Sequence, residues 1–371
     1  MPTIAVIANT SWNLHNFRRS LIRRLMSEGF EVVAIAPTDE FSEKVRSLGC
    51  RFAPLESLER KGTNPFGDVR LAREFARIFR REKISVALTF TIKPNIYGSV
   101  AGWIAGVPTV ATVTGLGYTF LEPGILQTIT RRLYKFAFSK SARVVFQNAD
   151  DREVFLQGRL APAAKTMLIR GSGIDTTHFA PQPQSLENER LTFLFIARLL
   201  FHKGIREYVE AARIVHEKRP NTLFQIAGDL DPGNPSAITE ADLQSWLARP
   251  EIEYLGHLSD TRPAMAKADV VVLPSYREGL PRVILEALSM SKPIVTTDTA
   301  GCRDTLIENE NGYLAPVGDA AGLADAMLRM TNLTAVERHA MGEKSRQLAL
   351  QEFDEKIVQA KYLEIIRSLT H

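Results

Sequence analysis

The sequence predicts an α/β protein made of two similar doubly wound domains in tandem. Short apolar, β-branched stretches alternate with amphipathic stretches along the chain, as in parallel sheets covered by helices on both faces. This alternation occurs twice, and a polar, proline-rich stretch at residues 180–190 separates the two series as an expected linker. At 371 residues, the chain also favours two domains over one.

The first series contains five short apolar stretches of the kind that forms buried parallel strands. They span residues 4–8, 31–36, 85–90, 109–113 and 143–146. Amphipathic stretches between them predict helices at residues 17–27, 68–81, 95–105 and 125–139. We expect these elements to form a first Rossmann-like domain over residues 1–180.

The second series repeats this pattern and predicts a second Rossmann-like domain over residues 181–353. Its expected strands span residues 191–196, 223–227, 252–255, 270–273 and 294–296. The final stretch, residues 354–371, has apolar residues at helical spacing, and we expect this helix to pack back near the first domain. Ligands are expected in a cleft between the two domains.

The longest uncharged stretch, residues 94–121, is long enough to span a bilayer. Pro108 and several glycines, including Gly98, Gly102, Gly106 and Gly115, interrupt it. We therefore expect a helix that packs closely on a sheet through a glycine face, followed by a strand. Cys50 and Cys302 have neither disulfide nor metal-ligand spacing, which fits a reducing compartment. The opening residues, "MPTIAVIANTSW", fit a first strand and not a signal peptide.

Positive charge is concentrated in the first half of the chain. Residues 1–180 hold 25 Lys and Arg against 15 Asp and Glu, a net charge of +10, and the remainder has a net charge of −6. This asymmetry indicates an anionic partner such as a membrane surface or phosphates, although ordinary variation in surface charge also produces it. Residues 130–143, "TRRLYKFAFSKSAR", mix basic and aromatic residues as an interfacial helix does, with an ordinary amphipathic helix as the alternative. No nucleic-acid-binding module is recognised, so we do not expect a nucleic-acid partner.

Two glutamates lie in the apolar stretch "YREGLPRVILEALSMSKPIV". Glu278 follows a predicted strand, and Glu286 lies inside a helix for which Pro281 is the expected first residue. A buried carboxylate needs a partner, and paired sugar hydroxyls suit its acceptor oxygens. Gly279 and Leu280 would then lie at a helix N-terminus, where backbone N–H groups favour phosphate. Two surface glutamates that only favour the helix are the alternative.

Two cations lie in the stretch "IARLLFHKGIREYVEAARIV", in which a strand at residues 191–196 precedes a helix at residues 205–216. Arg198 and Lys203 fall in the intervening loop, at the carboxyl edge of the predicted sheet. A guanidinium fork and an ammonium point charge both suit diphosphate oxygens. Solvated loop charges are the alternative.

The combination of these motifs resembles the family-4 retaining glycosyltransferases. Glu278 and Glu286 match the spacing of that family's E-x7-E signature, with Gly-Leu-Pro between them and Arg198 and Lys203 upstream. The stretch "GSGIDTTHF" resembles the family's interdomain element, and "AGCRDTLIENENGYL" resembles a later one, with Asp304 where a glutamate is usual. The resemblance covers essentially the whole chain.

The resemblance implies a GT-B fold, with the donor nucleotide sugar on the second domain and the acceptor on the first. It implies retention at the anomeric carbon and neither a metal nor another cofactor. Arg198 and Lys203 would neutralise the diphosphate leaving group, Glu286 would bind the ribose, and Glu278 the transferred sugar. The turn of Gly279, Leu280 and Pro281 would hold the donor through backbone N–H groups. The leaving phosphate would take the acceptor's proton, so no side-chain base is required.

Two loops of the first half depart from the family's pattern. The loop "TVTGLGYTF" has Thr114 where many members carry a histidine, and Thr114 and Gly117 are the expected donor contacts there. Tyr118 of this loop is a candidate acceptor residue. The loop "NTSWNLHNF" lacks the usual glycines, and Asn13 and His15 are expected to shape an acceptor pocket. A residue at the start of a helix is the alternative for His15.

Within the family, the chain looks most like bacterial enzymes that add an N-acetylhexosamine to an undecaprenyl-diphosphate-linked sugar, such as the type that adds N-acetylgalactosamine to diphospho-bacillosamine. The stretches "NLHNFRRSLIRRL", "TIKPNIYGSVAG" and "VTGLGYTFLEPG" carry this likeness. It implies UDP-GalNAc as donor and Lys93 as a contact for the acceptor diphosphate. It also implies a peripheral protein that touches the cytoplasmic face of the bacterial inner membrane through its first domain.

Three other functions stay open at this point. A nucleotide-sugar epimerase of the same fold would turn over a UDP-sugar without an acceptor. A non-catalytic nucleotide-sugar binding protein would bind the donor without turnover, against which the intact charged residues count. A nicotinamide-dependent oxidoreductase is disfavoured because no G-x-G-x-x-G follows the first strand.

Overall fold

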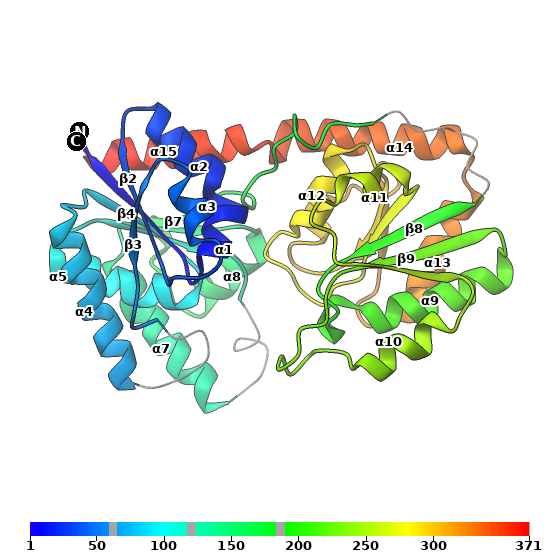
Figure 1. Cartoon of the computed structure of the whole chain (residues 1–371), viewed down its shortest axis with the longest axis horizontal. Coiled ribbons are helices and arrows are strands. Elements are labelled where there is room, and N and C mark those ends of the chain that lie inside the picture. Colours follow the sequence, from blue (N-terminus) through cyan, green and yellow to red (C-terminus); the bar gives the residue numbers. More distant parts are fainter. Residues whose placement is uncertain (59–64, 117–123, 183–189, 371) are drawn as a thin grey trace. The chain divides into compact units, whose positions relative to one another are not determined.

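The computed structural model describes residues 1–58, 65–116, 124–182 and 190–370. The chain divides into two compact units (Figure 1). Unit 1 comprises Met1–Ser172 together with Lys356–His371, and unit 2 comprises Gly173–Glu355. Each unit is built on one sheet of parallel strands, which confirms the predicted pair of doubly wound α/β domains.

Unit 1 contains a seven-stranded parallel sheet with the order β3-β2-β1-β4-β5-β6-β7. Its strands are β1 (Thr3–Ile7), β2 (Glu31–Ala36), β3 (Arg51–Pro54), β4 (Val86–Phe90), β5 (Thr109–Val113), β6 (Arg143–Phe146) and β7 (Thr166–Leu168). Its helices are α1 (Ser11–Asn13), α2 (Arg19–Ser27), α3 (Ser42–Arg46), α4 (Pro65–Arg81), α5 (Ser99–Ala105), α7 (Ile125–Lys140), α8 (Ala149–Gln157) and α15 (Glu355–Thr370). The apolar side chains of α2 and α15 join the core on one face of this sheet, and those of α4, α5 and α7 lie on the other face (Figure 1).

Unit 2 contains a six-stranded parallel sheet with the order β10-β9-β8-β11-β12-β13. Its strands are β8 (Leu191–Ile196), β9 (Thr222–Ala227), β10 (Ile252–Gly256), β11 (Val270–Leu273), β12 (Ile294–Thr297) and β13 (Gly312–Ala315). Its helices are α9 (Ile205–Lys218), α10 (Glu240–Leu247), α11 (Arg262–Lys267), α12 (Arg282–Ser289), α13 (Ala320–Asn332) and α14 (Ala335–Leu348). One continuous core of buried apolar side chains fills this unit.

The boundary between the units differs from the predicted position at residues 180/181. The segment after Ser172 packs in unit 2, because the Ile174 N–H donates to the Phe353 carbonyl at 2.8 Å and the Ile174 side chain is fully buried in that core. The Ser289 hydroxyl also donates to the Phe179 carbonyl at 2.8 Å. The expected linker at residues 180–190 falls mostly outside the described residues.

The C-terminal helix α15 belongs to unit 1 from its second residue onward and contributes to the core of this unit from Val358. Val358, Tyr362 and Ile366 recur on its buried face. The Tyr362 hydroxyl lies 2.8 Å from the Thr112 hydroxyl of β5, and both side chains are fully buried. This contact joins residues 250 positions apart in the sequence.

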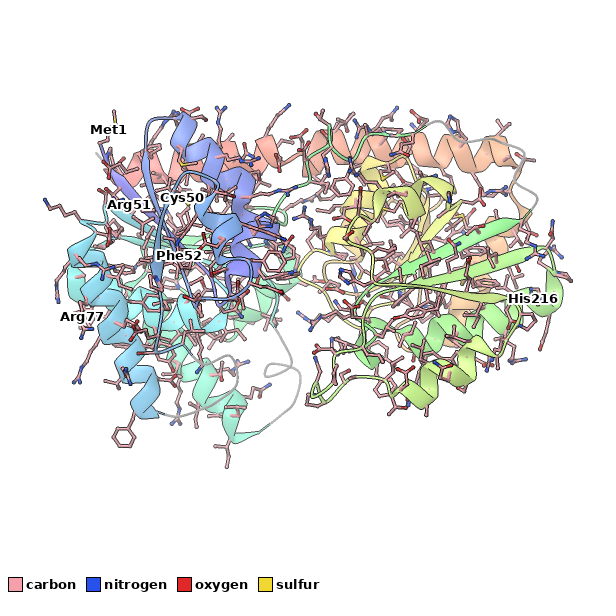
Figure 2. The ribbon with its side chains drawn as sticks, viewed as in Figure 1. Met1, Cys50, Arg51, Phe52, Arg77 and His216 are labelled. Carbon is pink, nitrogen blue, oxygen red and sulfur yellow. The ribbon has the colours of Figure 1, made fainter. Side chains whose placement is uncertain are left out.

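In the helix after β4, the predicted glycine face packs on the sheet at Gly98 and Gly102, whereas Gly106 ends α5 in a left-handed conformation with no atom within 4 Å of an added Cβ. A Cβ atom added at Gly98 would lie 2.9 Å from a methyl group of Thr89, and one added at Gly102 would lie 2.3 Å from a methyl group of Thr109. This segment starts as a π-helical turn at Pro94–Gly98 before α5 begins. Among the described residues, no helix is both long and apolar enough to cross a membrane. Cys50 (Figure 2) and Cys302 are buried and form no disulfide.

Gly301 holds the loop after β12 against the loop after β11. Its φ of +78° is a left-handed conformation, which an L side chain adopts only with strain. A Cβ atom here would lie 2.5 Å from the Glu278 carbonyl oxygen and 2.6 Å from the Gly279 carbonyl oxygen. The close approach of two backbones therefore requires glycine at this position.

We predict that Gly301→Ala lowers the free energy of unfolding more than Gly256→Ala does. Gly256 has a similar φ of +66°, but nothing lies within 4 Å of an added Cβ, so that change costs only the conformational strain of about 1–2 kcal/mol. Gly301→Ala adds a clash with backbone atoms, which we expect to cost about 1–3 kcal/mol more. Urea unfolding of the two variants measures this difference, and equal losses would contradict the close packing.

Candidate functional site

The candidate residues of unit 2 lie at the carboxyl edge of its sheet, where the strand order reverses. β8 and β11 are neighbours in the sheet, and the chain leaves them toward opposite sides to form β9 and β12. Such a reversal opens a crevice between the loops that follow the two strands. The loop after β8 carries Arg198 and Lys203, and the loop after β11 carries Glu278.

The structure brings Lys203 and Glu278 together as an ion pair. The Lys203 ammonium donates to Oε1 of Glu278, and the Ser275 hydroxyl donates to the same oxygen at 2.7 Å. The Lys203 and Glu278 side chains are only 19% and 14% exposed. Partial burial strengthens the attraction between the charges and penalises the loss of either partner. Sequence reasoning identified both charges but not the serine, whose position is set by the strand that ends just before it.

Backbone contacts fix the two loops relative to each other. The Tyr276 N–H donates to the His202 carbonyl at 2.9 Å, which joins the loop after β11 to the loop after β8. Gly204, with a φ of +76°, packs so closely that an added Cβ would lie 2.0 Å from the Pro274 carbonyl oxygen. On the other side, the Thr299 hydroxyl donates to the Tyr276 carbonyl at 2.9 Å. The ion pair is therefore held by a rigid frame of backbone.

His202 lies next to this pair but has its own partner. Its Nδ1 is 2.7 Å from the Ser236 hydroxyl. Burial lowers the pKa of His202, and the neighbouring charge of Lys203 acts in the same direction. The imidazole is therefore neutral at pH 7 and adds no charge to the site.

Arg198 lies in the same loop as Lys203 but points to another partner. Its guanidinium donates to Oδ2 of Asp231 at 2.7 Å, in the segment after β9. The Arg198 side chain is more than half exposed, and an exposed ion pair of this kind stabilises a protein by about 0–1 kcal/mol. A ligand with more negative charge would therefore displace Asp231 from Arg198 at little cost.

Glu286 is the more deeply buried of the two glutamates. It lies in α12 and accepts hydrogen bonds from the Thr261 hydroxyl and from Nε of Arg282, both at 3.1 Å. Burial raises the pKa of Glu286, because the Arg282 charge and these hydrogen bonds offset only part of the desolvation. The protein thus keeps a carboxylate where its ionised form is disfavoured, which is common at functional sites.

The turn between the glutamates differs by one residue from the prediction. Pro281 is the residue that precedes α12, not its first residue, since its ψ of 113° is extended and the helix begins at Arg282. Its carbonyl accepts from the N–H groups of Ile284 and Leu285. Gly279 is buried, and Leu280 packs against the core of unit 2. The turn therefore leads directly into the helix N-terminus, where backbone N–H groups lack intrahelical acceptors.

The candidate residues of unit 1 also follow strands at the point where the strand order reverses, here between β1 and β4. Asn13 and His15 come after β1, Lys93 after β4, and Thr114 directly after β5. The Lys93 ammonium lies 3.3 Å from Oδ1 of Asp68 in α4, so this cation is already paired. Gly117 and Tyr118 lie outside the described residues.

Several polar atoms of this region are buried without a partner in the described chain. They include Oδ1 of Asn13, Nδ1 of His15 and Oγ1 of Thr91. Burial lowers the pKa of His15, and the charges of Arg19 and Lys44 act in the same direction. Thr91 also has a φ of +72°, an uncommon conformation for a β-branched residue. The sequence did not identify Thr91 as a candidate site residue, because no local pattern of residues predicts a strained backbone conformation.

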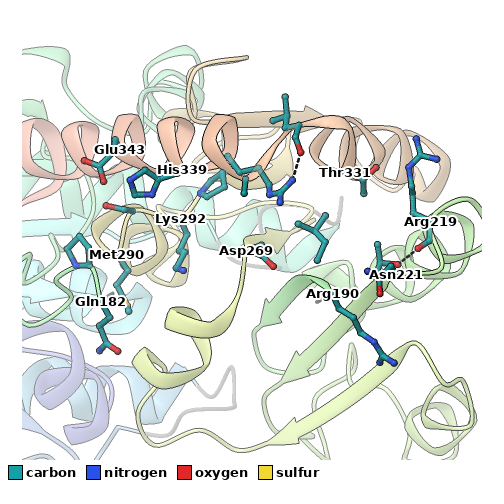
Figure 3. A pocket seen from close by; sticks show the side chains of 18 of the residues that line it. Gln182, Arg190, Arg219, Asn221, Asp269, Met290, Lys292, Thr331, His339 and Glu343 are labelled. Atoms are coloured by element: carbon teal, nitrogen blue, oxygen red, sulfur yellow. Dashed lines mark hydrogen bonds between the residues drawn. The ribbon is translucent and has the colours of Figure 1, made fainter. Parts of the chain in front are cut away.

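A cavity of about 740 Å³ lies elsewhere in unit 2, at the amino ends of its strands (Figure 3). Its lining includes several basic side chains, and two of them, Lys292 and Arg219, form hydrogen bonds within unit 2. The Lys292 ammonium donates to the carbonyls of Ala266 and Ala268 at 2.9 and 2.8 Å, and burial lowers its pKa to about 8. The Arg219 guanidinium donates to Oδ1 of Asn332 at 2.9 Å. The candidate residues Arg198, Lys203, Glu278 and Glu286 are not part of this lining.

Comparisons with known proteins match both units to glycosyltransferase families. Residues 15–171 match the family model described as "Glycosyl transferase 4-like domain", and residues 190–332 match "Glycosyl transferases group 1". The first match lies in unit 1 and the second lies in unit 2. The two matches therefore include all the candidate site residues of unit 2 and all those of unit 1 except Asn13.

Two curated bacterial enzymes are similar in sequence. The N,N'-diacetylbacillosaminyl-diphospho-undecaprenol alpha-1,3-N-acetylgalactosaminyltransferase of Campylobacter jejuni is 28% identical, over 98% of this chain and 97% of that enzyme. The UDP-Gal:alpha-D-GlcNAc-diphosphoundecaprenol alpha-1,3-galactosyltransferase of Escherichia coli is 27% identical, over 69% of this chain and 68% of that enzyme.

Two solved structures share the fold. A glycosyltransferase from Rickettsia africae superposes with a TM-score of 0.83 at 18% identity, covering 99% of this chain and 98% of the other. HepE from Anabaena, solved with UDP and glucose, superposes with a TM-score of 0.81 at 17% identity, covering 99% of this chain and all of the other. Both units and the sequence signature thus point the same way, and the chain belongs to the family-4 retaining glycosyltransferases, which are hexosyltransferases of the GT-B fold.

Proposed function

We propose that this glycosyltransferase moves an N-acetylhexosamine, such as GalNAc from UDP-GalNAc, onto a polyprenyl-diphosphate-linked sugar during glycan assembly. The observation that carries the chemistry is the Lys203–Glu278 pair at the carboxyl edge of the unit 2 sheet. A cation and a sugar-binding carboxylate side by side suit a ligand with a diphosphate next to a hexose.

The choice of donor and acceptor rests on the relatives. The names of the Campylobacter jejuni and Escherichia coli enzymes both include a diphospho-undecaprenol-linked acceptor. The name of the Escherichia coli enzyme also includes UDP-Gal, and the Anabaena protein was solved with UDP. A lipid-linked acceptor places the reaction at a membrane surface, which we propose is the cytoplasmic face of the bacterial inner membrane.

In our proposal, each residue of unit 2 acts on one part of the donor. Arg198 exchanges Asp231 for the diphosphate, and Lys203 stabilises the charge that develops on the same group. Glu278 accepts hydrogen bonds from hydroxyls of the transferred sugar, and Glu286 accepts them from the ribose. The turn of Gly279, Leu280 and Pro281 presents backbone N–H groups to the phosphate oxygens.

The residues of unit 1 would supply the contacts to the acceptor and the remaining contacts to the donor. Asn13 and His15 have buried polar atoms with no partner among the described residues, as expected for groups that await a ligand. Lys93 would bind the acceptor diphosphate by leaving Asp68. Thr114 and Gly117 would contact the donor sugar, and Tyr118 the acceptor.

The reaction we propose keeps the configuration of the anomeric carbon. The bond from this carbon to the diphosphate oxygen breaks, and the bond to the acceptor oxygen forms on the same face. The leaving phosphate oxygen takes the proton of the acceptor hydroxyl, so charge and atoms balance without a side-chain base.

Nucleotide release by the purified protein tests this function. UDP-GalNAc, UDP-GlcNAc and GDP-mannose would each be supplied with and without a short polyprenyl-diphosphate-sugar acceptor. We expect UDP release that depends on the acceptor, most strongly with UDP-GalNAc. Release without acceptor would indicate an epimerase or hydrolase instead, and donor binding without release would indicate a binding protein.

We predict that Glu278→Gln lowers kcat/KM for transfer by on the order of 100-fold, because it removes the charge that faces Lys203 and the sugar. The matched control is Glu253→Gln, an exposed glutamate of β10 that is bonded to Gln225 at 2.7 Å. Steady-state kinetics and far-UV circular dichroism of both variants check the loss and the fold. Unchanged turnover in Glu278→Gln would remove this residue from the site.

We also predict that Glu286→Gln gains stability relative to the native protein as the pH rises. The folded pKa of Glu286 lies above its unfolded value of about 4.3, so the native carboxylate costs stability as the pH rises past that value. The loss of stability reaches its full value above the raised pKa. Glutamine has no ionisable carboxyl, so the variant does not lose stability in this way. Urea unfolding of both proteins from pH 4 to pH 8 measures the difference, and a difference that shrinks with rising pH would contradict the proposed burial cost.

A further inference from the structure

Unit 1 exposes large apolar side chains on the sheet face covered by α4, α5 and α7. Phe66 and Val69 lie at the start of α4, and Trp103 and Ile104 lie in α5. Phe66 is 88% exposed and Trp103 is 55% exposed. The helix α5 packs against both α4 and α7, so these side chains belong to one region of unit 1. Large apolar side chains that are exposed on neighbouring helices favour an interaction surface.

The helix α7 has one apolar stripe in the core and a second one in solvent. Tyr134 and Phe138 are buried in unit 1. Ile125, Ile129 and Phe136 recur at helical spacing on the opposite side and are exposed, Ile125 by 82%. The Phe136 ring contacts the Trp103 ring edge to face at 6.2 Å, which links the outer stripe of α7 to α5.

The same region is strongly basic. Exposed cations follow the apolar residues along α4 at Arg70, Arg73 and Arg77, the last labelled in Figure 2, and along α7 at Arg132 and Lys135. The 16 residues of α7 contain no acidic residue. The Lys140 ammonium lies 4.5 Å above the Trp103 ring, so charge and aromatic surface are interleaved.

The acidic residues of α4 do not neutralise these cations. Asp68 accepts from the Tyr97 hydroxyl at 2.6 Å and pairs with Lys93. Glu74 accepts from the backbone N–H groups of Glu56 and Ser57, each at 2.9 Å. Their charges are thus used inside unit 1, while the arginines on the outer side of α4 remain exposed.

We propose that this face of unit 1, which we call the basic-apolar face (α4, α5 and α7), docks on the surface of an anionic phospholipid bilayer. Aromatic and aliphatic side chains enter the boundary between headgroups and acyl chains, and the surrounding Arg and Lys side chains bind lipid phosphates. Each cation near such a surface adds to the attraction, and salt weakens it. This inference builds on the proposed lipid-linked acceptor, since docking would bring unit 1 to the membrane that holds it.

Vesicle binding by the full-length protein tests the docking without any catalysis. Vesicles of phosphatidylethanolamine and phosphatidylglycerol are compared with vesicles of phosphatidylcholine by co-sedimentation at low and high salt. We expect binding to the anionic vesicles only, weakened by salt. Equal binding to both kinds of vesicle, or to neither, would overturn the proposal.

Two sets of variants locate the surface. The triple change Arg73→Glu, Arg77→Glu and Arg132→Glu should lower partitioning onto anionic vesicles at least about tenfold. The control reverses the charge of three exposed lysines of unit 2 (K218E, K267E and K344E) and should lower partitioning onto the vesicles far less. Phe66→Ser with Ile125→Ser should also weaken binding, unlike Val336→Ser, which removes an exposed valine of unit 2. Equal effects of the test and control sets would overturn the assignment.

Two further measurements separate this proposal from its alternatives. Transfer to a short, water-soluble acceptor should be unchanged in the triple variant, since none of its positions lies in the candidate site. A loss there with vesicle binding intact would overturn the docking role and not the enzymatic one. Sedimentation equilibrium tests whether the basic-apolar face instead binds a second copy of the chain. We expect no dimer through this face. A dimer of the native protein that is lost in the double variant Phe66→Ser with Ile125→Ser would overturn the membrane docking.

Discussion

All strands in both sheets run parallel, and this constraint determines where each functional group can lie. A parallel sheet places the carboxyl ends of all its strands at one edge, and the reversal of strand order opens that edge beside the first strand. In unit 2 the reversal lies between β8 and β11, whose loops supply Lys203 and Glu278. In unit 1 it lies between β1 and β4, whose loops supply Asn13 and Lys93. Both units therefore place their candidate residues in the loops beside the reversal of strand order, with different side chains in each unit.

The charges at the unit 2 site are held in different ways, which fits different tasks. Lys203 and Glu278 are partly buried and fixed to each other by two loops with close backbone contacts. Arg198 is exposed and weakly tied to Asp231, so it is free to change partner at little cost. Glu286 is buried in a helix at a cost to its ionised form. The proposed function requires binding of a diphosphate and two sets of hydroxyls, for which fixed acceptors and an adaptable cation are both suited.

The two units also differ in their surfaces, as the split of charge along the sequence indicates. The positive excess of the first half is concentrated on helices that also expose aromatic and aliphatic side chains. In unit 2, by contrast, Lys292 and Arg219 of the cavity in Figure 3 donate to main-chain and side-chain carbonyls. Lys292 and Arg219 are therefore part of the fold of unit 2, whereas the cations of the basic-apolar face of unit 1 lie on the surface.

The local sequence pattern was enough to predict the central strands, the two-domain α/β architecture and the charged residues of the signature. Buried strands and motif spacings depend on residues close together in the sequence. The three missed strands, β3, β7 and β13, lie at sheet edges and span only three or four residues. Partial exposure also interrupts the apolar run of β3 and β7. Only the tertiary structure decided the boundary after Ser172 and the partners Ser275, Asp231 and Thr261. These features depend on contacts between segments far apart in sequence, which no local pattern of residues records.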